Sequence, residues 1–119
     1  MNIKTILLLI VLLTFFNLAT YSQQGEKVAK VVIDAGHGGE DSGCLGKKSK
    51  EKNVNLTVAL KLGKLITENY EDVKVIYTRK TDVFVELYRR AQIANDNHAD
   101  LFISIHCNAA ENKSAHGIE

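Results

Sequence analysis

The sequence has no proline, only two cysteines and no surplus of charge of either sign. Cys44 and Cys107 can form one disulfide at most, which excludes a disulfide-rich scaffold. A formal net charge of +1 at pH 7 lacks the basic surplus of a nucleic-acid-binding domain, so nucleic acid is not an expected partner. No internal repeat or low-complexity segment divides the 119 residues, and this length suits a single domain.

The N-terminus carries the longest hydrophobic run of the chain. A positive lead in residues 1–4 precedes an aliphatic run in residues 6–13, and Thr20 and Ser22 are small residues suited to signal-peptide cleavage. The alternative is an uncleaved membrane anchor, against which the polar residues within and after the run argue. We therefore expect export to the periplasm or the medium, with only transient membrane contact through this peptide. The predicted division of the chain is a signal peptide in residues 1–22, a polar lead-in in residues 23–27 and one domain in residues 28–119.

Apolar strands and amphipathic helices alternate after this lead-in. Strands are predicted over residues 28–33, 73–78 and 101–105, and helices over residues 53–69 and 85–95. This β-α-β-α-β order predicts an α/β domain with three α/β/α layers and a mainly parallel central sheet. The first strand is nearly continuously apolar and is expected to be buried on both faces. The apolar arcs expected to cover the sheet are Val54, Val58, Ala59, Leu62, Leu65 and Ile66 in the first helix, and Leu87, Ala91 and Ala94 in the second.

Three potential metal ligands lie at one edge of the predicted sheet. His37 follows the first strand in a glycine-rich loop, Glu51 comes just before the first helix, and His106 follows the third strand. The carboxyl ends of parallel strands share one edge with the starts of the following helices, and ligand sites of open α/β proteins gather there. Two imidazoles and one carboxylate with an open fourth position form the ligand set of a catalytic zinc site. We therefore predict that these three residues hold one zinc ion per chain.

Each of the three residues has a structural alternative when it is taken alone. His37 can be a solvated turn residue, Glu51 can offset the charge of the surrounding lysines, and His106 can be a hydrogen-bonded core histidine. Their placement at one edge favours the metal site over these alternatives. His98 and His116 lie in polar loops and are expected at the surface.

Several ordered motifs carry a resemblance to a known family. They are Asp34-Ala35-Gly36-His37-Gly38-Gly39, Asp41-x-Gly43, Glu51-Lys52-x-Val54-Asn55-Leu56, Thr78-Arg79-x-x-Asp82, Leu87-x-x-Arg90, Ala94-Asn95 and Ser104-Ile105-His106-x-Asn108-Ala109. In this order and spacing, over residues 28–119, they resemble the zinc-dependent N-acetylmuramoyl-L-alanine amidase family, type 3 catalytic domain. The resemblance implies hydrolysis of the amide between the lactyl group of N-acetylmuramic acid and L-alanine in peptidoglycan. It also implies that the zinc ligands are His37, Glu51 and His106.

The sequence departs from the family pattern within the loops that carry the ligands. Ala35 stands where the family often has proline, and Cys44 and Cys107 stand where small residues are usual. The two cysteines can brace the site as a disulfide or simply fill space, and a direct role on zinc is the third alternative. Arg79, Asp82 and Arg90 recur in the family pattern around the second helix. An Arg79–Asp82 pair can brace the turn after the second strand, and contact with the substrate is the alternative.

The resemblance also places one functional residue beyond this chain. The general base of the family, a glutamate, lies after the segment that corresponds to Glu119, so the catalytic residue is left unassigned. We expect a sheet that is incomplete at its C-terminal end, a truncated catalytic domain and weakened activity. The two functions that remain open are an exported zinc amidase and a non-catalytic zinc- or peptidoglycan-binding fragment. A different secreted zinc peptidase shares the ligand set, but its His-Glu-x-x-His motif is absent.

Overall fold

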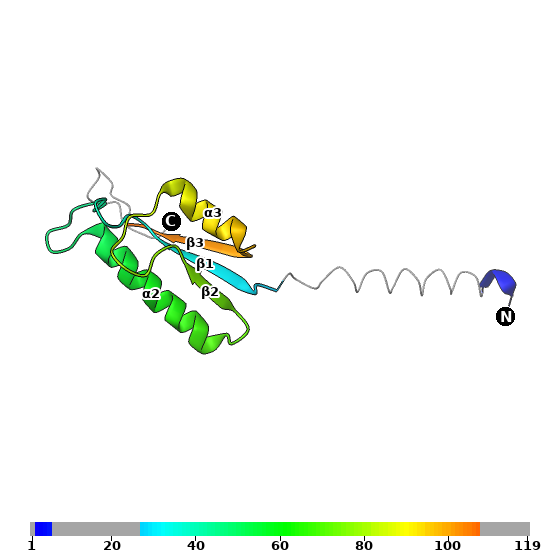
Figure 1. Ribbon diagram of the computed structural model, residues 1–119. Helices are drawn as coiled ribbons and strands as arrows, with labels where there is room; N and C mark the ends of the chain where they lie inside the picture. Colours follow the sequence, from blue (N-terminus) through cyan, green and yellow to red (C-terminus); the bar gives the residue numbers. More distant parts are fainter. Residues whose placement is uncertain (1, 6–26, 108–119) are drawn as a thin grey trace, which may run out of the picture.

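The computed structural model describes residues 2–5 and 27–107 (Figure 1). The predicted signal peptide, apart from residues 2–5, lies outside the described residues, as do His116 and Glu119. Within the described ranges, no helix is both long and apolar enough to cross a membrane.

A three-stranded parallel sheet forms the centre of the domain. Its strands are β1 (Lys30–Ala35), β2 (Lys74–Tyr77) and β3 (Leu101–Ile105). They lie in the order β2-β1-β3, with Lys30 opposite Lys74 on one side of β1 and Val31 opposite Leu101 on the other. Because β1 is central, its side chains from Val31 to Ala35 are at most 3% exposed, as its apolar run predicts. The strand begins and ends two residues later than expected.

Two helices cover opposite faces of this sheet. Figure 1 shows α2 (Glu51–Asn69) on one face and α3 (Leu87–Asp96) on the other, which gives the three predicted layers. Each helix begins two residues away from its predicted start, because α2 already includes Glu51 and α3 begins only at Leu87. The α/β fold with a parallel sheet is therefore confirmed. Both helices start at the edge where the strands end.

The sheet-facing side of α2 differs from the predicted arc. One row of buried residues faces the sheet, and its members lie four residues apart: Glu51, Asn55, Ala59 and Gly63. Leu62 and Ile66 pack beside this row as expected. Three residues expected to be buried are instead 37–57% exposed: Val54, Val58 and Leu65. The cause is a close approach at Gly63, where the Tyr77 ring leaves no room for a Cβ atom, so the helix packs through its small residues.

The prediction that the apolar face of α3 is buried is also wrong. Leu87 is 80% exposed, Ala91 is exposed and Ala94 is half-buried. The residue of α3 that is buried is Arg90, whose guanidinium reaches the Asp34 carboxylate on β1. This ion pair turns a polar side chain toward the sheet and leaves Leu87 and Ala91 beside an open hollow.

Candidate metal centre

The three predicted ligands meet at the carboxyl edge of the sheet. Their candidate ligand atoms all lie within 4.8 Å of one another. Glu51 Oε1 is 3.1 Å from His37 Nε2 and 3.3 Å from His106 Nδ1, and the two imidazole rings lie edge to face with centroids 4.9 Å apart. The structure thus brings together one residue from the end of β1, one from the start of α2 and one from the end of β3. His98 is exposed, as expected, and takes no part.

Glu51 is the buried member of the group and is held by backbone donors. Its side chain is 4% exposed. The backbone N–H of Cys44 donates to Oε2 at 2.9 Å, and that of Cys107 donates to Oε1 at 2.8 Å. Burial opposes ionisation of this carboxyl, but the two backbone hydrogen bonds and a third from Asn55 outweigh it and lower the pKa of Glu51 to about 2. Glu51 is therefore an ionised carboxylate at neutral pH.

The His37 ring is oriented by a contact at Nδ1, the ring nitrogen that does not face Glu51. Its Nδ1 lies 2.7 Å from Asp41 Oδ2, and Asp41 Oδ1 accepts a hydrogen bond from Gly43 N–H at 3.0 Å. The backbone of His37 adopts a left-handed φ of 61°, which is uncommon for a residue with a side chain. Arg90 Nη2 donates to the His37 carbonyl at 3.0 Å and so helps to hold this conformation. The ring is thus fixed on both the backbone side and the side-chain side.

His106 rests against the loop that carries His37. Its imidazole lies so close to Gly36 that a Cβ atom at that position would overlap the ring. The Gly36 N–H donates to the Ile105 carbonyl at 3.0 Å, which joins the end of β3 to the start of this loop. The glycine therefore allows both histidines to approach Glu51.

The chemistry of these atoms suits a divalent cation. In the tautomer whose Nδ1–H donates to Asp41, the Nε2 of His37 carries a lone pair directed at the Glu51 carboxylate. The lone pairs of the imidazole and the carboxylate repel one another. A cation bound between them can accept electron density from each of them. The His37 and His106 side chains are 23% and 44% exposed, so the group is open on the side of the histidines. Two imidazoles, one carboxylate and an open side fit a catalytic site better than a closed structural one.

Sequence reasoning missed the residues that support the ligands. Asp41 and Asn55 occur in the family motifs, but neither was assigned a contact. A carboxylate four residues from a candidate histidine ligand is the available signal for Asp41, because ligating histidines commonly donate their other N–H to a carboxylate. Asn55 could have been recognised from its position four residues after Glu51 on the same helix face.

The prediction that Arg79 pairs with Asp82 is wrong. Asp82 instead pairs with Lys52, whose Nζ lies 2.6 Å from Oδ2, while Oδ1 accepts from Gly39 N–H at 2.8 Å. Arg79 turns away to backbone carbonyls near the ligands. The turn is braced, as expected, but through Lys52 at the start of α2 and through a hydrogen bond from Arg79 to the Thr81 carbonyl.

Both cysteines are free thiols in the structure, so the possible disulfide is not formed there. Cys107 Sγ is directed at Asn55 Oδ1, 3.5 Å away. The Cys44 thiol interacts with Glu51, which raises its pKa. Both residues also contribute through their backbone N–H groups, which donate to the Glu51 carboxylate.

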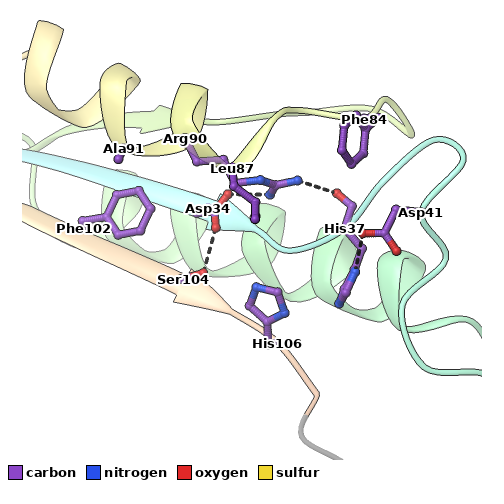
Figure 2. Close-up of a pocket in the computed structure, with 10 residues that line it drawn as sticks. All are labelled: Asp34, His37, Asp41, Phe84, Leu87, Arg90, Ala91, Phe102, Ser104 and His106. Atoms are coloured by element: carbon purple, nitrogen blue, oxygen red, sulfur yellow. Dashed lines mark hydrogen bonds and ion pairs between the residues drawn. The ribbon is translucent and has the colours of Figure 1, made fainter.

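A hollow of about 390 Å³ opens beside the two histidines. Figure 2 shows His37 and Asp41 at one end of it and Ala91 and Phe102 at the other. Leu87 lies between them, above the buried Asp34. The hollow thus joins an apolar surface to the open side of the metal centre.

If His37 is a metal ligand, we expect the substitution Asp41→Asn to weaken the binding of a divalent cation such as zinc about 10–100-fold, the usual effect of removing a partner that orients a metal-ligating histidine. An amide accepts from the imidazole more weakly than a carboxylate and does not raise its basicity. Zinc affinity measured by competition with a chromogenic chelator checks this. The matched control is Asp96→Asn, whose side chain is exposed and lies far along α3. Equal affinities for Asp41→Asn and the wild type would show that Asp41 does not support the ligand.

Comparisons with known proteins match one family over most of the domain. The profile of the family described as N-acetylmuramoyl-L-alanine amidase matches residues 31–119. A putative N-acetylmuramoyl-L-alanine amidase of Buchnera aphidicola subsp. Baizongia pistaciae is 43% identical over 89 residues, which cover 74% of this chain and 41% of the relative. The sporulation-specific N-acetylmuramoyl-L-alanine amidase of Bacillus subtilis is 42% identical over 82 residues, which cover 69% and 32%.

A solved structure is similar as well. The catalytic domain of CwlV, an N-acetylmuramoyl-L-alanine amidase from Bacillus (Paenibacillus) polymyxa var. colistinus, superposes with a TM-score of 0.68 at 41% identity. The superposition covers 72% of this chain and 49% of that domain. The chain therefore spans about half or less of the length of the proteins it matches.

Proposed function

Because the chain belongs to the N-acetylmuramoyl-L-alanine amidase family, we propose that it is the metal-binding part of a zinc amidase that acts on peptidoglycan. The bond to be hydrolysed is the amide between N-acetylmuramic acid and L-alanine. The observation that carries the proposal is the convergence of His37, Glu51 and His106 within 4.8 Å at the edge where the strands end. The family and the ligand geometry point to the same chemistry independently.

In this proposal, His37, Glu51 and His106 hold one zinc ion. When bound, zinc polarises the scissile carbonyl and lowers the pKa of a coordinated water. The chain supplies the rigid frame for this chemistry. Backbone N–H groups fix the Glu51 carboxylate, and Asp41 fixes the His37 ring, so little rearrangement is needed on binding. The open side of the histidines faces the hollow, where the substrate has access.

We further propose that the protein is exported to the cell wall. The support is the sequence of residues 1–22, with its positive lead, aliphatic run and small residues at the cleavage point. The domain then begins at residue 28, after a polar lead-in. Its substrate, peptidoglycan, is a partner located outside the cytoplasm.

A second candidate function is zinc or peptidoglycan binding without catalysis. Within residues 27–107, two carboxylates line the hollow, and both are already engaged: Asp34 with Arg90 and Asp41 with His37. Glu51 belongs to the proposed ligand set. Neither carboxylate of the hollow is therefore free to transfer a proton there, and this observation favours a role limited to binding for the part of the domain described.

Zinc content and peptidoglycan assays on the purified chain separate the two functions. For the amidase, we expect about one zinc per chain and new L-alanine amino termini released from purified peptidoglycan. A chelator should stop the release, and added zinc should restore it. For the binding fragment, we expect zinc and co-sedimentation with peptidoglycan, but no release. A chain that neither binds zinc nor sediments with peptidoglycan would contradict both.

A further inference from the structure

Arg79 is a buried cation that the proposed reaction does not use. It lies in the turn after β2 and is 3% exposed. Its guanidinium donates to four backbone carbonyls, and no carboxylate accepts from it within the described part of the chain. Burying a charge without an ionic partner is unfavourable unless hydrogen bonds compensate it. Four carbonyls supply that compensation here, so their identity indicates what the residue does.

Three of these carbonyls belong to the segments that carry His37 and Glu51. Nε donates to Ala35 at 2.8 Å, and Nη2 donates to Gly36 at 2.9 Å, immediately before His37. The same Nη2 donates to Lys52 at 2.9 Å, immediately after Glu51. One guanidinium therefore joins the backbone before one proposed ligand to the backbone after another.

The fourth carbonyl belongs to Thr81, in the turn that contains Arg79 itself, at 3.1 Å. This bond holds the guanidinium against its own turn. The donors of the other three bonds therefore keep a fixed position. Arg90 shares the Ala35 carbonyl with Arg79. Among the described residues, its other hydrogen bonds go to Asp34 and to the carbonyls of Val85 and His37, and none of them reaches the start of α2.

Asn55 also joins the Gly36 carbonyl to the Glu51 carboxylate, and Lys52 reaches the Gly39 carbonyl. Arg79 differs from both because one guanidinium donates to the backbone directly before His37 and directly after Glu51.

We propose that Arg79 is a positioning residue that sets the spacing between His37 and Glu51 and thereby determines the affinity of the site for zinc. The inference rests on the proposed function, because it takes these residues as metal ligands. The planar guanidinium has donors in fixed directions, whereas a lysine ammonium is a compact charge that cannot span the same carbonyls. Charge alone is therefore not sufficient for this role.

The test is Arg79→Lys, which keeps the charge and removes the fork of donors. We expect zinc to bind about 10–100-fold more weakly, the range found when a residue that supports metal ligands is changed. We also expect the visible absorption spectrum of the cobalt-substituted protein to change, because the ligand atoms are no longer held in the same arrangement. A residue with a purely structural role would alter stability without altering this spectrum.

The matched control is Ile66→Ala, which removes a core contact near the far end of α2. It should lower the free energy of unfolding but leave zinc affinity and the cobalt spectrum of the folded protein unchanged. If Arg79→Lys fails to fold, Arg79→Gln carries the same test, because its neutral amide avoids burying an ammonium group. Its zinc affinity is expected to fall by a similar factor.

The outcomes separate this inference from the proposed function. A wild-type chain that binds no zinc overturns both. A wild-type chain that binds zinc, with Arg79→Lys or Arg79→Gln giving the same affinity and the same cobalt spectrum, overturns the positioning role alone. Weaker binding and a changed spectrum in the arginine variants, with neither in Ile66→Ala, support it.

Discussion

Glu51→Gln is expected to remove zinc binding, with a loss of affinity greater than about 100-fold, because the substitution removes the only anionic ligand of the group. Both carboxylate oxygens also accept backbone hydrogen bonds, Oε2 from Cys44 and Oε1 from Cys107. A glutamine side chain must place its NH₂ group opposite one of these N–H donors in either orientation. The site therefore loses both its negative charge and the hydrogen bonds that orient the side chain. The volume of the side chain stays the same.

Zinc per chain after gel filtration, followed by competition titration, measures this effect. Glu68→Gln is the matched control, because it makes the same change on the same helix at an exposed side chain whose ion pair among the described residues is with Lys64 at 3.6 Å. The control should retain wild-type zinc content. If Glu51→Gln also retained it, Glu51 would not be a ligand, and the metal centre would have to be assigned to other residues.

Asp34→Asn is expected to destabilise the domain by about 3 kcal/mol at neutral pH, the lower end of the range for breaking a buried ion pair. Asp34 Oδ1 accepts from Thr78 and Arg90, and Oδ2 accepts from Ser104, all at 2.7 Å. The side chains of Asp34 and Arg90 are 4% and 6% exposed. An asparagine can keep most of these hydrogen bonds but leaves the buried Arg90 charge unpaired, so the loss is mainly electrostatic.

The pH dependence of this loss has a definite sign. Burial acts to raise the pKa of Asp34, but hydrogen bonds from Ser104, Thr78 and Arg90 outweigh it and hold the pKa below the ordinary value of 3.8. A lowered pKa in the folded state stabilises the protein fully above pH 3.8, and this stabilisation is lost as the pH falls through the folded-state value. The difference between the wild type and Asp34→Asn should therefore shrink in acid.

Urea unfolding at neutral pH and below pH 3.8 tests both statements. Asp72→Asn serves as the control, because Asp72 is exposed and makes its ion pair with Lys27 at the surface. Such pairs contribute only about 0–1 kcal/mol. If Asp34→Asn cost less than about 1 kcal/mol at neutral pH, the backbone carbonyls around Arg90 would be sufficient to hold its charge.

The proposed ligand set could be predicted from sequence because it depends only on topology. In a parallel sheet with helical crossovers, residues that follow strands and residues that start helices lie at one edge. This placement does not depend on the direction of their side chains. His37, Glu51 and His106 occupy such positions, and the structure places them together. The apolar run of β1 likewise predicted a strand buried on both faces, because only such a strand needs apolar side chains in succession.

The supporting contacts could not be predicted in this way because they depend on side-chain directions. The pairing of Asp82 with Lys52 and the bond from Arg79 to the Lys52 carbonyl depend on how α2 sits on the sheet. That placement follows from the close packing of Gly63 against Tyr77, which hydrophobic periodicity does not reveal. The same packing explains why Val54, Val58 and Leu65 were expected to be buried and are not.

By itself, the sequence determined the order of the elements, the parallel sheet and the edge at which two histidines and a glutamate gather. These follow from short-range patterns and from the constraint that parallel strands impose on their connections. The tertiary structure decided how rigidly those three side chains are held. Buried cations and backbone donors from segments far apart in the sequence converge on them, and such convergence exists only once the layers have packed.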